Sequence, residues 1–177
     1  MTTAIVLSRT YQRAARSVDA GGGRRLFASA AVRNLSGEQL HDSLRTASGF
    51  PLIGGDDVSD PGRRDRRRFA AAFQVARPTT DARTVLQALT LMNGTLSTLA
   101  TNPDETPTLA AAMSPIFDNE ERVQTLFLAT LGRPARSGEL KEMAGYVERG
   151  GADHDPRKAL ADVFWALINS SEFNTNH

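Results

Sequence analysis

The 177-residue sequence contains no cysteine. This absence excludes disulfide bonds, thiolate nucleophiles, zinc fingers, iron–sulfur clusters and covalently attached haem. A cysteine-free chain is stable in an oxidising and in a reducing compartment, so the absence does not predict a location.

Long hydrophobic runs and an excess of charge of one sign are also missing. No stretch approaches the roughly 20 apolar residues that a helix needs to cross a bilayer. The formal net charge is +1, so the overall charge favours no polyanionic partner. Hydrophobic and charged contents of 40% and 23% are ordinary for a globular protein. We therefore predict one domain over residues 1–177, with a core that needs no disulfide or metal.

The first residues show no secretory pattern. A signal peptide has a basic start, an apolar middle longer than residues 1–7 and a small-residue cleavage site, and residues 1–13 have none of these. Taken alone, this start predicts a cytoplasmic protein.

No segment alternates apolar and polar residues over the length of a strand, whereas apolar residues recur at helical intervals. The clearest helix begins with Asp155 as its cap and Pro156 in the first position. One face of that helix carries Leu160, Val163, Phe164, Leu167 and Ile168. We predict an all-α fold, an irregular bundle of six to eight helices with long loops.

Start and stop signals bound the other predicted helices. Ser36 and Gln39 form a capping box, and Gly49 closes the helix that they open. Asn119 and Ser137 are predicted to cap the two helices before the last one. Shorter helices are predicted at residues 3–17, from residue 63 up to Pro78, and at 107–113. The last turn, residues 169–173, is expected to fray into a polar tail.

The longest helix is predicted over residues 81–100. Its buried stripe would consist of Val85, Leu89, Met92, Leu96 and Leu99. Gly94 lies on the other side of this helix and costs about 1 kcal/mol relative to alanine. It therefore indicates a close helix contact or a bend.

Residues 49–62 are predicted to form a loop rich in glycine, proline and aspartate. Its aspartates lack the alternate spacing and closing glutamate of a calcium loop, so we expect no ion site there. The following run, Arg63–Arg68, is the best case for a polyanionic partner. No aromatic residues interleave with it, and on a helix its arginines would spread around more than one face. We expect solvated or intramolecularly paired arginines, and nucleic-acid binding through this run is the alternative, which predicts salt-sensitive retention of DNA or RNA.

Four stretches of the sequence resemble, in the same order, one protein family. They are residues 5–12 (Ile-Val-Leu-Ser-Arg-Thr-Tyr-Gln), 35–44, 86–93, and 128–134 taken together with 164–173. The family is the C-terminal domain of unknown function in large planctomycete-type secreted proteins. In those proteins the domain follows another uncharacterised helical domain, and often a cytochrome-c-like domain lies further upstream.

The resemblance implies that this chain is a truncated member, whose upstream domains and signal peptide would precede Met1. It also implies an extracytoplasmic location for the full-length form and no established activity. The family's cysteine before the long helix is absent here, since residues 73–80 contain none. Any role of that stretch in the family is therefore not carried over to this chain.

The sequence shows no nucleophile–base motif, phosphate loop or paired-carboxylate signature. His41, His154 and His177 lie far apart without metal-ligand spacing, and His41 is expected on the solvated surface. We therefore predict no catalytic, cofactor-binding or metal-binding residues. Polar and aromatic residues in the family-like stretches are the candidate interaction or motif positions: Tyr11, Gln39, Asp42, Gln87, Asn93, Arg133, Trp165, Asn169, Glu172 and Phe173.

Two functions follow as hypotheses. The first is a non-catalytic interaction or structural module that docks against an upstream domain or partner protein. The alternative is part of an enzyme or accessory factor in polysaccharide or redox metabolism that needs the upstream domains. The alternative requires carboxylates such as Glu38, Asp42 and Glu172 to converge in a cleft.

Overall fold

The computed structural model describes residues 7, 33–51, 61–73, 90–92 and 94–176. These residues form an all-α fold with one two-residue antiparallel strand pair, which confirms the predicted fold class. The helices are α2 Gly37–Ser48, α3 Pro61–Ala72, α5 Thr95–Ala100, α6 Pro107–Ala112, α7 Asn119–Leu131, α8 Ser137–Glu148, α9 Pro156–Ile168 and α10 Ser171–Asn174. The strands are β1 Arg33–Asn34 and β2 Thr175–Asn176. The helix predicted at residues 3–17 and most of the predicted loop lie outside the described residues.

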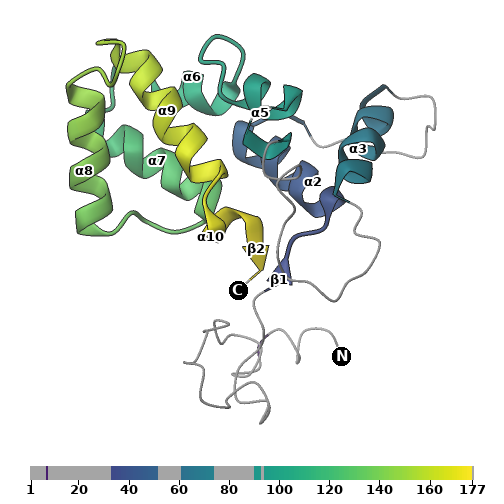
Figure 1. Cartoon of the computed structure of the whole chain (residues 1–177). Helices are drawn as coiled ribbons and strands as arrows, with labels where there is room; N and C mark the ends of the chain where they lie inside the picture. The colour runs from purple at the N-terminus through teal and green to yellow at the C-terminus, as the bar shows by residue number, and fades with distance from the viewer. Residues whose placement is uncertain (1–6, 8–32, 52–60, 74–89, 93, 177) are drawn as a thin grey trace.

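Helices α7, α8 and α9 pack against one another and enclose the main core, and α6 covers α7 (Figure 1). Helix α2 links this core to α3, which lies furthest from it (Figure 1). The largest fully buried side chains are Phe127 of α7 and Phe164 of α9. All five residues of the apolar face predicted for α9 are buried, which confirms that face. Each such side chain contributes about 1.5–3 kcal/mol by leaving water.

The helix starts follow capping chemistry, with one correction. Ser36 and Gln39 form the predicted capping box, and Gly49 closes α2 in the left-handed conformation. Asp118, not Asn119, caps α7, and the carboxylate of Glu121 accepts a hydrogen bond from the Asp118 amide at 3.0 Å. A cap at Asn119 would place an arginine three residues later, which offers no acceptor for the reciprocal bond.

Helix α8 also starts one residue earlier than predicted, because Ser137 is its first residue rather than its cap. Glu139 accepts a hydrogen bond from the amide of Arg136 at 2.8 Å, so a carboxylate reaches back over the helix start. Among the described helices, none has both the length and the hydropathy of a membrane-spanning segment.

The predicted continuous helix over residues 81–100 is wrong at Gly94. This residue has an extended backbone and precedes α5, while residues 90–92 belong to a separate helical stretch. A β-carbon at Gly94 would lie 2.2 Å from the carbonyl oxygen of Thr90. The break also changes the buried side, since Leu91 and Ala100 are buried and Met92 is 41% exposed. Residues 81–89 lie outside the described part of the chain.

The end of the chain does not fray as predicted. The Ser170 hydroxyl accepts a hydrogen bond from the amide of Phe173 and so caps the new helix α10. Strand β2 then pairs with β1, and Leu35 N donates to Asn174 O at 3.1 Å. Because Phe173 is also buried, the polar tail is held against the start of α2.

Candidate functional site

Arg133, in the turn between α7 and α8, forms ion pairs with two glutamates from different helices. Its Nε and Nη2 donate to the two carboxylate oxygens of Glu172 at 2.5 and 2.7 Å. Its Nη1 and Nη2 donate to the carboxylate of Glu139 at 2.9 and 3.0 Å. The guanidinium carbon lies 5.4 Å from the ring centre of Phe127. We call Arg133, Glu139 and Glu172 the arginine triad.

The arginine triad carries fixed charges. Hydrogen bonding to Arg133 lowers the pKa of Glu139 to about 2, and the bonds to Glu172 and Glu139 raise the pKa of Arg133. A group that stays ionised near neutral pH is a poor proton donor, so this arrangement does not suit Glu139 for general acid catalysis. Its geometry instead ties the α7–α8 turn to α8 and α10.

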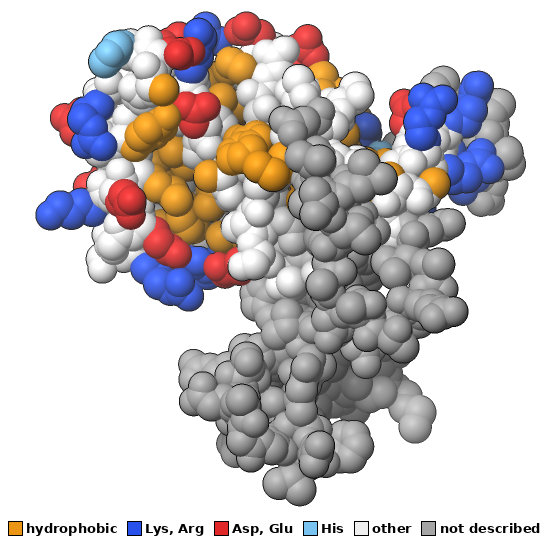
Figure 2. All heavy atoms as spheres, in the orientation of Figure 1, with side chains coloured by type: hydrophobic (Ala, Val, Ile, Leu, Met, Phe, Trp, Pro, Cys, Tyr) orange, Lys and Arg blue, Asp and Glu red, His pale blue; other side chains and the backbone are white. Residues whose placement is uncertain are grey.

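A second ion pair joins α2 to α3. Arg66 donates from Nε and Nη2 to the two carboxylate oxygens of Asp42 at 2.8 and 2.6 Å, in a bidentate arrangement. The bonds to Arg66 lower the pKa of Asp42. Asp42 therefore also remains ionised and serves as a link between helices. Of the arginine run, Arg64, Arg67 and Arg68 are exposed. Basic side chains gather on the surface of α3 (Figure 2).

The expectation that His41 lies on the solvated surface is wrong. Its residue is only 2% exposed, because the ring of Phe69 from α3 packs edge-on against it at 5.7 Å. Its Nδ1 lies 3.3 Å from Oδ1 of Asp42. Burial lowers the pKa of His41, although the hydrogen bond with Asp42 opposes that shift.

Two of the three carboxylates that the enzyme hypothesis names lie at one hollow of about 340 Å³ between α2, α7 and α10. Asp42 and Glu172 line it, together with Thr46, Thr130 and Phe173, whereas Glu38 does not. In the described part of the chain no three His, Cys, Asp or Glu side chains are placed to hold a metal ion. Both lining carboxylates accept hydrogen bonds from arginines, so neither has the isolated environment that raises a catalytic pKa.

The other candidate positions serve the packing of α9 and α2. Trp165 is half-buried, and its Nε1 donates to the carbonyl oxygen of Met92 at 3.2 Å. Asn169 donates from Nδ2 to the carbonyl oxygen of Trp165 at 2.9 Å. Gln39 acts in the capping box of α2. Three further candidates lie outside the described residues: Tyr11, Gln87 and Asn93.

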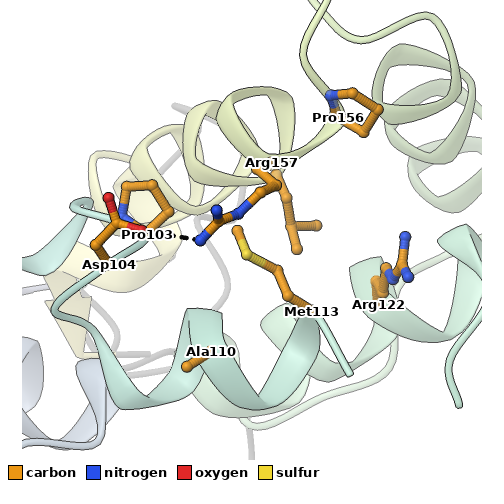
Figure 3. Close-up of a pocket in the computed structure, with 8 residues that line it drawn as sticks. Pro103, Asp104, Ala110, Met113, Arg122, Pro156 and Arg157 are labelled. Carbon is orange, nitrogen blue, oxygen red and sulfur yellow. Dashed lines mark hydrogen bonds and ion pairs between the residues drawn. The ribbon is translucent and has the colours of Figure 1, made fainter. Parts of the chain in front are cut away.

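A larger hollow, of about 430 Å³, lies between α6, α7 and the start of α9 (Figure 3). We call it the α6–α9 cavity. It is lined by Pro103, Asp104, Ala110, Met113, Arg122, Pro156, Arg157 and Leu160. None of these residues is a candidate position from the sequence, because four separate segments bring them together and no local pattern connects them.

Comparison with family models, with curated proteins and with solved structures gives no match.

Proposed function

We propose that this chain is a non-catalytic helical interaction module of a larger planctomycete-type extracytoplasmic protein. One observation carries the proposal: the charged side chains at the candidate positions are committed to ion pairs between helices. Asp42 holds α3 against α2, and Arg133 holds α8 and α10 together. These groups stabilise the arrangement of the helices, which leaves the outer surface as the part that a partner can contact.

The surface carries hydrophobic side chains that a docking partner could cover. Ile116 is 85% exposed in the turn before α7, and Leu128 is 54% exposed on α7 itself. Hydrophobic side chains also gather in a band on the face that carries α8 and α9 (Figure 2). A contiguous band of exposed apolar side chains is typical of a surface that meets another protein. The partner that the family resemblance implies is an upstream domain.

The test measures binding between this chain and the polypeptide encoded immediately upstream. Size-exclusion chromatography with light scattering should show a one-to-one complex, and calorimetry should give its affinity. The double variant Ile116→Ser/Leu128→Ser should weaken that affinity at least tenfold, which is about 1.4 kcal/mol. The matched control is Ala111→Ser, at an exposed position on α6. The proposal would be contradicted if the chain stayed a monodisperse monomer and formed no complex with the upstream polypeptide.

The alternative, a part of an enzyme or accessory factor, has one observation in its favour. Asp42 and Glu172 both line the hollow between α2, α7 and α10. Their arginine partners weigh against it, because a carboxylate that acts as a general acid needs a raised pKa and Arg66 lowers that of Asp42. An Asp42→Asn variant that abolishes an activity of the full-length protein while keeping its fold would favour this alternative.

A further inference from the structure

We propose that the α6–α9 cavity binds a small monocarboxylate with a short hydrocarbon body. Its volume of about 430 Å³ lies within the range of about 300–1,000 Å³ that ligand pockets occupy. Arg122 and Arg157 both line it, and Met113 lies between them in the view of Figure 3. The inference is independent of the docking surface proposed above, because it concerns a different set of residues.

Arg122 supplies the anchor for the carboxylate. Its Nη1 donates to Oδ1 of Asn119 at 3.1 Å, while its Nε is covered and has no hydrogen-bond partner within the described part of the chain. A covered N–H without an acceptor destabilises the chain, so an acceptor brought by a ligand would recover that loss. A carboxylate binds a guanidinium side-on at its Nε–Nη2 edge, and the flexible side chain of Arg122 can turn this covered edge toward the cavity.

The charge of the lining selects a monoanion. Two arginines and Asp104 give the cavity walls one net positive charge. Arg157 donates to Oδ1 of Asp104 at 2.9 Å, but the two side chains are 61% and 75% exposed. Ion pairs between exposed side chains are weak because water screens them, so Arg157 can turn toward a bound anion. A doubly charged phosphate would carry one negative charge more than the lining can neutralise.

The remaining walls select the body of the ligand. Five of the eight lining residues are apolar: Pro103, Ala110, Met113, Pro156 and Leu160. No hydroxyl or amide side chain lines the cavity, so a sugar ring would find few partners. Met113 has a flexible thioether that adapts to different hydrocarbon shapes. An aliphatic chain of a few carbons therefore fits these walls better than a polar body does.

The experiment is a titration of the isotope-labelled full chain with hexanoate, followed by amide NMR shifts. Saturable shifts should appear at Ala110, Met113 and Leu160. Hexanol has the body without the charge and acetate has the charge without the body, so both should bind at least tenfold more weakly. Equal binding of hexanoate and hexanol, or no saturable shift, would overturn the proposal and leave a water-filled hollow.

The anchor is tested with Arg122→Gln, which should weaken hexanoate binding at least tenfold. The control is Arg149→Gln, which changes an exposed arginine at the end of α8 that is outside the cavity and should bind as the unaltered chain does. Ala110→Phe fills the cavity from an exposed position on α6 and should abolish binding even if Arg122→Gln does not fold. Unchanged affinity in a folded Arg122→Gln chain, or in Ala110→Phe, would overturn the proposal.

Discussion

Arg133 Nε donates to Glu172 Oε1 at 2.5 Å, and the two residues lie 39 positions apart in the sequence. The same guanidinium contacts Glu139 in the first turn of α8. Both the arginine and Glu172 are mostly buried, at 23% and 29% side-chain exposure. One side chain therefore links the α7–α8 turn, the start of α8 and the C-terminal helix α10.

We expect Arg133→Ala to lower the free energy of unfolding by about 2 kcal/mol. Hydrogen bonds to charged groups contribute about 1.5–3 kcal/mol, and the substitution also leaves two partly buried carboxylates without their common partner. Arg133→Lys should lower the free energy of unfolding by more than half as much as Arg133→Ala does, because an ammonium cannot form bidentate hydrogen bonds with a carboxylate. Urea denaturation, monitored by circular dichroism, measures the free energy of unfolding of the unaltered chain and of both variants.

The matched control for this variant is Arg149→Ala. Arg149 is an exposed arginine, and surface substitutions of this kind usually change stability by no more than about 0.5 kcal/mol. If Arg133→Ala cost no more than the control, the arginine triad would have no structural role and the main support for the proposed function would be lost.

The second prediction concerns acid pH and Glu139. Its folded pKa of about 2 lies below the ordinary value of 4.5. A group with a depressed folded pKa contributes stability that is complete above pH 4.5 and is lost as the pH falls toward 2. The stability difference between the unaltered chain and Glu139→Gln should therefore shrink steadily from pH 5 to pH 2. Chemical denaturation at several pH values measures it.

Glu142→Gln is the control for that experiment, since it removes an exposed carboxylate from the same helix. Its stability difference from the unaltered chain should be small at every pH. A difference for Glu139→Gln that stays constant down to pH 2 would show that the Arg133 contact does not depend on the charge of Glu139.

The third prediction places a pH dependence near neutrality at His41. Burial lowers its pKa below 6.5, and the groups facing it are Asp42, Arg45, Arg66 and the ring of Phe69. Because the unfolded chain takes up the proton first, stability is complete above pH 6.5 and falls as the pH drops below it. The urea midpoint should be lower at pH 5.5 than at pH 7.5.

This dependence should be weaker in His41→Phe and unchanged in His154→Asn. His154 is exposed and has a φ of 54°, a conformation that asparagine tolerates. The change of stability with pH is compared, rather than the stability at one pH, because His41→Phe also alters the packing against Phe69. The prediction would be wrong if the change of stability with pH persisted in His41→Phe and disappeared in His154→Asn.

Elements with local signals could be predicted from the sequence. The apolar face of α9 follows from residue spacing alone, and the capping box of α2 follows from Ser36 and Gln39. The spacing of apolar residues predicts one helix over residues 81–100, but spacing does not show where a glycine permits a break. Gly94 has no β-carbon, so the chain can approach the Thr90 carbonyl more closely than any other residue type would allow, and α5 begins after it.

The candidate sites depend on contacts that no local pattern encodes. Arg133 and Glu172 were both candidate positions, yet nothing in their spacing predicts that they form one ion pair. His41 is buried because Phe69 approaches from another helix, which a sequence motif cannot show. The α6–α9 cavity is a gap left by the packing of several segments, so Arg122 has no signal of its own.

The fourth prediction compares two glycines with the same backbone conformation. Gly132 caps the end of α7 and Gly150 lies in the turn after α8, with left-handed φ values of 65° and 75°. A β-carbon at Gly132 would have no atom within 4 Å, so Gly132→Ala should cost only the strain of the left-handed conformation, about 1–2 kcal/mol. A β-carbon at Gly150 would lie 2.5 Å from the carbonyl carbon of His154.

Gly150→Ala should therefore cost clearly more than Gly132→Ala, by about 2 kcal/mol or more, because backbone atoms rather than a flexible side chain must move. The carbonyl oxygen of Gly150 accepts a hydrogen bond from the amide of Asp155 at 2.8 Å, and Asp155 caps α9. Opening that turn would loosen the start of α9, which contributes more buried core residues than any other described helix. Equal losses for the two variants in urea denaturation would mean that the turn relaxes freely and that the close approach to His154 does not fix the start of α9.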